Sequence, residues 1–260
     1  MNILFIGDIF GSPGRNLMKK YLPDLKKEFE IDFCIANGEN AAHGKGITKK
    51  TAEELFNCGI DCFTSGNHIW DKKESIEYLK QEPRILRPIN FNKDSVGNTL
   101  YIADVGNSKL AVVNLAGQVY MSPVNSPFTA LEKILPEIKK VTNNIFVDFH
   151  AEATAEKRSI AFHFDGKISA LIGTHTHVQT ADEDILPNKT AYLTDAGMTG
   201  PHDSCIGIEK GIAITKMITS MPQQFQPATG GLQINAVVVG IDENTGQATK
   251  IERILRKYDE

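Results

Sequence analysis

The chain has 260 residues, of which 41% are apolar and 23% are charged, and its formal net charge is −4. This is ordinary globular composition, so it excludes disordered, collagen-like and coiled-coil chains. A mildly acidic chain is also a poor candidate for a stable complex with long nucleic acid, because that binding depends on releasing counterions from many phosphates. Small nucleotides are not excluded, since they need only local positive charge or a metal ion.

The sequence predicts a cytoplasmic protein with no membrane partner. No run of apolar residues is long enough for a membrane helix, and residues 1–8 lack the basic start of a signal peptide. The four cysteines, Cys34, Cys58, Cys62 and Cys205, match no zinc or redox motif. We therefore expect reduced thiols.

The first third of the chain alternates short apolar runs with longer amphipathic stretches. Strands are predicted at 2–7, 32–37 and 61–65, and helices at 16–29, 49–58 and 71–79. Strands and helices that alternate in this way are typical of an α/β domain with parallel strand pairing.

The remainder contains more strands. The pattern predicts a hairpin of 98–104 with 108–116, a helix at 127–140 interrupted near Pro136, strands at 144–149, 167–173 and 190–195, and a helix at 154–162. Loops are expected over 196–207 and 220–231, and the strands 231–241 and 246–254 should pair. We expect one domain over residues 1–260, with two sheets and helices outside them.

Polar residues that can bind metal recur where the predicted strands stop. They are Asp8, Glu39, Asn67 with His68, His150, and His175 with His177. In open α/β sheets the carboxyl ends of the strands face the ligand crevice. A mixture of carboxylate, amide and imidazole suits manganese, iron, zinc or cobalt rather than calcium. Without His68, six candidate ligands remain, and six ligands suit two metal ions that share one carboxylate.

The spacing of His175 and His177 adds to this prediction. On extended backbone, residues two apart point to the same face, so one ring can reach each metal ion. Nucleophilic serine and cysteine settings are not recognisable in the sequence.

At these positions the sequence resembles the calcineurin-like metallophosphoesterases, whose pattern includes Gly-Asn-His, a lone His and Gly-His-x-His in that order. It departs from them at Phe10, where that superfamily has a metal-binding His, and at Glu39, which stands in place of a bridging Asp. Both departures are typical of the YmdB-like phosphodiesterases. The matching segments are Gly7–Gly11, Asn37–Ala42, Gly66–Asp71, Phe149–Thr154, Gly173–Asp182 and Asp195–Pro201.

The resemblance implies a four-layer α/β/β/α sandwich of two mixed sheets flanked by helices. It also implies that Asp8 and His177 bind one metal ion, that Asn67, His150 and His175 bind the other, and that Glu39 bridges them. Iron or manganese is expected, with zinc, cobalt or magnesium as alternatives. Asn40 would contact the substrate, and His68 would be the catalytic histidine.

The implied reaction is hydrolysis of a cyclic nucleotide, either 2′,3′ or 3′,5′, by a hydroxide that bridges both ions. A histidine can supply the proton that the leaving oxygen needs. Two alternatives stay open: a metal-dependent phosphomonoesterase, and a non-catalytic regulatory protein that binds nucleotide or RNA. The sequence also leaves open a homo-oligomer and roles for His43, Lys45 and His202 near the site.

Overall fold

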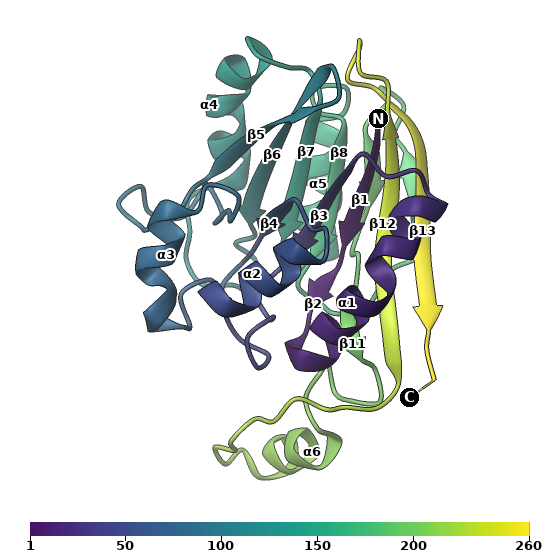
Figure 1. The fold of residues 1–260 in the computed structure, drawn as a ribbon. Helices are drawn as coiled ribbons and strands as arrows, with labels where there is room; N and C mark the ends of the chain where they lie inside the picture. The colour runs from purple at the N-terminus through teal and green to yellow at the C-terminus, as the bar shows by residue number, and fades with distance from the viewer. Residues whose placement is uncertain (260) are drawn as a thin grey trace.

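Two β-sheets pack face to face between two layers of helices in the computed structural model, which describes residues 1–259 (Figure 1). Both sheets contain parallel and antiparallel strand pairs. This is the four-layer α/β/β/α architecture that the resemblance implied.

The first sheet has seven strands, with a parallel centre and antiparallel neighbours. In spatial order they are β2 (Asp8–Ile9), β11 (Met198–Pro201), β12 (Leu232–Ile241), β1 (Asn2–Ile6), β3 (Phe33–Asn37) and β4 (Cys62–Thr64), with β13 (Ala248–Lys257) also paired to β12. The parallel run β1, β3, β4 confirms the prediction for the first third of the chain. The pairing of β12 with β13 confirms the predicted C-terminal hairpin.

The second sheet has six strands. In order they are β5 (Leu100–Val105), β6 (Ser108–Ala116), β7 (Ile145–His150), β8 (Ala170–Thr174), β10 (Ala191–Leu193) and β9 (Asp184–Ile185). Strands β5 and β6 form the predicted hairpin, and β6, β7, β8 and β10 run parallel.

Six α-helices accompany the sheets. They are α1 (Gly11–Glu28), α2 (Lys49–Asn57), α3 (Ile76–Gln81), α4 (Pro127–Lys139), α5 (Thr154–His163) and α6 (Lys210–Thr219). Helices α1 and α2 pack on the first sheet and α4 and α5 on the second, while α6 extends away from both sheets (Figure 1). Within residues 1–259, no helix combines the length and the apolar character that a membrane crossing needs.

The apolar core fills the three spaces between the four layers. Alternation along β1 shows how: Ile3 and Phe5 face the second sheet, whereas Leu4 and Ile6 face the helices α1 and α2. A third cluster lies between the second sheet and the helices α4 and α5. Burial of this alternating pattern on both faces fixes the register of the strands.

Some predicted boundaries are wrong. Helix α1 begins at Gly11 rather than at residue 16. Its first turn packs tightly on β11, since a Cβ on Gly14 would lie 2.4 Å from the Thr199 carbonyl oxygen. Helix α4 continues through Pro136 without interruption. Predicted helix 71–79 starts later, as α3, after a 3₁₀ turn at Lys73–Ser75.

The sequence analysis missed two elements between residues 198 and 219, β11 and α6. The loop expected over 196–207 contains β11, which pairs with β2 and β12. Helix α6 escaped prediction because Ile214, Met217 and Ile218 are exposed on it, so its apolar residues do not mark a buried face.

Candidate metal and active site

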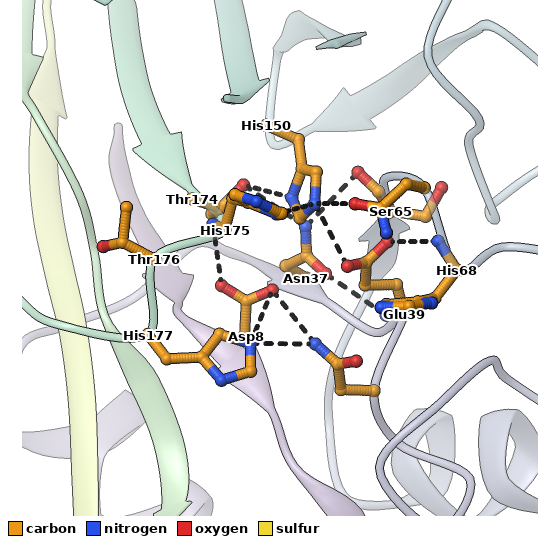
Figure 2. A network of polar contacts seen from close by, with 12 residues as sticks. Asp8, Asn37, Glu39, Ser65, His68, His150, Thr174, His175, Thr176 and His177 are labelled. Carbon is orange, nitrogen blue, oxygen red and sulfur yellow. Dashed lines mark hydrogen bonds and ion pairs between the residues drawn. The ribbon is translucent and has the colours of Figure 1, made fainter. Parts of the chain in front are cut away.

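The polar residues predicted at strand ends gather at one place in the structure, where strands of both sheets end (Figure 2). Asp8 lies in β2, Glu39 and Asn40 follow β3, Asn67 and His68 follow β4, His150 ends β7, and His175 and His177 follow β8. Because strands of both sheets carry these residues, the site lies where the ends of the two sheets meet.

Donor atoms converge on the ring of His150, which is fully buried. Its Nε2 atom lies 3.1 Å from Glu39 Oε1, 3.1 Å from Asn67 Oδ1 and 3.0 Å from His175 Nδ1. The ligand atoms of Glu39, His150 and His175 all lie within 4.8 Å of one another. One imidazole nitrogen cannot make three good hydrogen bonds, whereas a single cation satisfies all these donors.

A second group lies beside the first and consists of Asp8, Asn40 and His177. Asn40 Nδ2 is 3.5 Å from Asp8 Oδ1 and 3.1 Å from His177 Nε2, and His177 Nε2 is 4.0 Å from Asp8 Oδ1. The backbone N–H of His175 donates to Asp8 Oδ2 over 3.3 Å. That bond ties the two groups together.

A chain of buried hydrogen bonds orients His150 from behind. Its Nδ1 atom lies 3.0 Å from Thr174 Oγ1, whose hydroxyl donates to Asp148 Oδ1 over 2.7 Å. Asp148 Oδ2 also accepts from Asn37 Nδ2 at 3.1 Å. Partners of this kind fix the ring of a metal-binding histidine and leave its other nitrogen free for the ion.

His177 is oriented in a similar way. Its Nδ1 atom lies 2.9 Å from the carbonyl oxygen of Ile206, which therefore accepts a hydrogen bond and leaves Nε2 facing Asp8. The buried ring of Phe10 packs edge-on against the His177 ring, with centroids 5.6 Å apart. Phe10, which stands where the sequence resemblance led us to look for a histidine, thus supports a neighbouring candidate ligand.

The backbone of the His-x-His segment is not extended, so that part of the prediction is wrong. The φ angles of His175 and His177 are +103° and +64°, and residues other than glycine rarely adopt positive φ angles. A buried ion pair holds this segment: Lys157 Nζ lies 2.7 Å from Asp195 Oδ2 and donates to the Thr174 carbonyl oxygen.

Asp195 completes the support of the strained segment. Its carboxylate accepts from the backbone N–H groups of Thr176, at 3.1 Å, and Gly197, at 2.8 Å. Surrounding contacts of this kind are what keep strained backbone in place at functional sites. The sequence signal for the pair was weak: Lys157 lies inside a helix and Asp195 inside a predicted strand.

The electrostatics of the site mix strongly perturbed acids and bases. Burial opposes ionisation of Glu39, but the contact with His150 prevails and lowers the pKa of Glu39 to about 2. Burial also disfavours charge on His150, yet the Glu39 carboxylate raises the pKa of His150 to about 9. Burial raises the pKa of Asp8 well above its usual value, and burial together with His150 lowers the pKa of His175 to about 3.

Close packing leaves no room for a side chain at position 66. A Cβ on Gly66 would lie 2.0 Å from His150 Cδ2. Glycine therefore allows the segment that carries Asn67 to pass directly beside the His150 ring.

His68 lies at the edge of the group and is partly exposed. Its Nδ1 atom is 2.8 Å from Asp71 Oδ2, and its backbone N–H donates to Glu39 Oε2 over 2.9 Å. The ring is thus held by Asp71, with Nε2 available on its other side. Asp71 was part of the motif that carried the resemblance, but its role was not predicted.

A cavity of about 620 Å³ opens beside these residues. His43 and Lys45, whose roles the sequence left open, line it together with Ile206 and Phe225. His202 instead donates from Nε2 to the Met198 carbonyl oxygen. The cavity is within the usual size of small-molecule sites, which is roughly 300–1,000 Å³.

The donor set fits metal ions. It offers two buried carboxylates and three imidazoles, and the hydrogen bonds behind His150 and His177 leave a nitrogen of each ring directed at the site. Carboxylate oxygen with imidazole nitrogen is a ligand combination that iron, manganese, zinc and cobalt accept. Glu39, His150 and His175 are the residues that the geometry brings together most closely.

Known proteins resemble this chain over nearly its full length. The family model described as YmdB-like protein matches residues 4–254. A Bacillus subtilis protein named 2′,3′-cyclic-nucleotide 2′-phosphodiesterase is 47% identical over 259 residues, covering 100% of this chain and 98% of that protein.

Two solved structures superpose over almost all of the chain. A protein from Thermus thermophilus shares 37% identity with a TM-score of 0.94 and covers 100% of both chains. A phosphatase from Mycoplasma pneumoniae shares 33% identity with a TM-score of 0.94, covering 99% of this chain and 93% of that chain. The chain therefore belongs to the YmdB-like family.

Proposed function

We propose that this protein is a metal-dependent phosphodiesterase that hydrolyses 2′,3′-cyclic nucleotides. The observation that carries the proposal is the convergence of Glu39, Asn67 and His175 on Nε2 of His150 beside an open cavity. The name of the Bacillus subtilis relative supports the choice of the 2′,3′-cyclic substrate.

The proposed ligand sets follow the two groups of side chains. Asp8 and His177 would hold one ion, Asn67, His150 and His175 would hold the other, and Glu39 would serve both. We propose iron or manganese, since both accept mixed oxygen and nitrogen ligands. Bound ions of this kind neutralise phosphate charge and lower the pKa of coordinated water.

The chain's own side chains have separate tasks in this reaction. Asn40 lies between Asp8 and His177, where its amide can donate to a phosphate oxygen. Hydrolysis adds water at phosphorus and breaks one ester bond, so the leaving sugar oxygen needs a proton. We assign that proton to Nε2 of His68, because Asp71 holds the other ring nitrogen and the ring borders the cavity.

The experiment that tests this function compares two chromogenic esters. Purified protein is assayed with bis-p-nitrophenyl phosphate, a diester, and with p-nitrophenyl phosphate, a monoester, each with Mn²⁺ and with EDTA. Diester turnover that depends on metal and exceeds monoester turnover supports the proposal.

Other results favour other functions. Faster monoester turnover would favour a phosphomonoesterase, which the Mycoplasma pneumoniae structure makes the second candidate. No turnover of either ester by metal-loaded protein, together with binding of nucleotide, would favour a regulatory binding protein.

A further inference from the structure

The cavity beside the candidate metal site has two chemically different walls. One wall is polar and carries Glu39, Asn40 and the rings of His68, His175 and His177. Apolar side chains also line the cavity, and we call Phe10, Ile206, Ile208, Phe225 and Pro227 the apolar wall; two of them, Phe10 and Ile206, adjoin His177. We propose that the apolar wall binds the nucleobase of the substrate while its phosphate lies at the polar wall, an inference that rests on the proposed function.

Ile206 is the most informative residue of the apolar wall. Its side chain is 56% exposed although it is large and apolar, and its φ is +49°, a genuine outlier for a β-branched residue. Strain of this kind persists where surrounding structure fixes it and points to a functional position. A flat base that covers Ile206 would remove its apolar surface from water, which is favourable.

The conformation of Ile206 also serves the polar wall. Its carbonyl oxygen accepts the hydrogen bond from His177 Nδ1 at 2.9 Å. One strained residue therefore orients a candidate ligand with its backbone and offers an apolar side chain to the cavity.

Backbone hydrogen bonds hold the apolar wall together. Cys205 and Ile208 exchange two backbone hydrogen bonds, at 2.9 and 3.0 Å. The N–H of Glu209 donates to the Gln226 carbonyl oxygen at 3.0 Å, and the N–H of Ala228 donates to Gly207 at 2.9 Å. These bonds join the segment of Ile206 to that of Phe225, so little ordering entropy remains to oppose ligand binding.

Phe225 supplies an aromatic ring next to positive charge. The Nζ atoms of Lys45 and Lys216 lie 5.5 and 4.5 Å from its ring centroid, and the ring is partly exposed to the cavity. Aromatic rings are favourable partners for nucleobases. Lys45 brings positive charge to the cavity as well, which attracts an anionic phosphate ester.

The test compares a substrate with a base and one without. Hydrolysis of adenosine 2′,3′-cyclic phosphate and of methyl riboside 2′,3′-cyclic phosphate is measured for the wild type, Ile206→Ala and Phe225→Ala. Ile218→Ala is the matched control, because Ile218 is 79% exposed on α6 and does not line the cavity.

We expect each wall variant to lose about five- to thirtyfold in kcat/KM for the adenosine substrate, through KM, because base burial is lost. Turnover of the riboside substrate by Phe225→Ala should stay within about twofold, and the control should match the wild type. Because the backbone of Ile206 also holds His177, Ile206→Ala is judged by whether its loss on the adenosine substrate exceeds its loss on the riboside substrate. Equal losses on both substrates would overturn the proposal, because they would show an effect on the metal site instead. Unchanged kinetics would also overturn it.

A binding measurement separates this inference from the proposed function. Saturation-transfer NMR with adenosine is recorded on metal-free protein, and the base protons should receive saturation in the wild type and in Ile218→Ala but not in the two wall variants. If adenosine binds at the apolar wall but neither cyclic ester is hydrolysed, the proposed function is wrong and the base site is supported. If the cyclic esters are hydrolysed but the wall variants do not alter the saturation-transfer signals of adenosine, only the base-site inference is wrong.

Discussion

Nε2 of His150 lies 3.1 Å from Oε1 of Glu39, and both side chains are almost wholly removed from water. One residue follows a strand of the first sheet and the other ends a strand of the second, so this contact joins the two halves of the sandwich. Burying two such groups is costly unless they are paired or bind an ion. Substitutions of this pair therefore test most directly whether the site binds metal.

Replacing Glu39 by glutamine keeps the size of the side chain and removes its charge. Because we assign Glu39 to both ions, we expect the variant to lose bound metal. Its diester turnover should fall by more than the roughly ten- to hundredfold loss that follows removal of a residue that only hydrogen-bonds to a metal ligand. Metal content by plasma mass spectrometry and diester turnover check this. Glu132→Gln, at an exposed residue that contacts His163, is the control. Full metal content in Glu39→Gln would contradict the assignment.

Metal binding should become tighter as pH rises. The pKa of His150 is raised to about 9 by Glu39, so below that pH His150 carries a proton that an ion must displace. Burial raises the pKa of Asp8, which shifts the proton dependence of metal binding in the same direction. Below about pH 9 the apparent Mn²⁺ affinity should therefore increase with pH, and protons should be released. Calorimetric titrations in buffers of different ionisation enthalpy count those protons. Affinity that does not change with pH, without proton release, would rule this out.

His68→Gln should leave the metal ions in place and slow the reaction. Removing a proton donor to the leaving oxygen lowers kcat by about a hundred- to ten-thousandfold. The measurement pairs kcat with metal content. If metal content falls with activity, His68 acts on the metal site rather than on the leaving group.

A methyl group at position 66 should disturb His150. The Cβ of Gly66→Ala would lie 2.0 Å from His150 Cδ2, so one of the two must move. We expect about 1–3 kcal/mol of destabilisation and weaker metal binding. Gly211→Ala at the start of α6 is a control, since a Cβ there meets only the flexible Glu209 carboxylate, at 3.1 Å. Equal stability of both variants in urea unfolding would argue against the close packing.

Breaking the Lys157–Asp195 pair should affect stability and the site together. Both side chains are fully buried, so Lys157→Met leaves an uncompensated charge and should cost about 3–5 kcal/mol. The exposed pair Lys80–Glu77 is the comparison and should contribute about 0–1 kcal/mol. Urea unfolding measures both. A small loss in Lys157→Met would show that the pair does not hold the His175–His177 segment.

Much of the fold and of the candidate site was predictable from the sequence. The positions of Asp8, Glu39 and His150 were found because polar residues ended apolar runs, and parallel strands bring such ends to one edge. Alternating strand and helix patterns predicted the parallel centre of the first sheet, and two apolar runs around a short turn predicted the hairpin of β5 and β6.

The missed features depend on contacts between distant segments. Lys157 and Asp195 meet across 38 positions of the chain. Asp195 ends a predicted strand and opens a matching segment, but nothing in the local pattern of Lys157 pairs the two residues. The positive φ of His175 and His177 is imposed by that pair and by the Ile206 carbonyl group, not by their own residue types. Phe225 lies in a segment that is rich in proline, glycine and glutamine, which looked like a surface loop, so its place in the cavity depends on pairing with residues 205–209.

The most direct test of the central claim follows adenosine 2′,3′-cyclic phosphate by ³¹P NMR. The account predicts that protein loaded with Mn²⁺ converts the cyclic diester to a monophosphate, that EDTA stops the conversion, and that added Mn²⁺ restores it. An unchanged diester signal in a sample that holds two metal ions per chain would contradict the account.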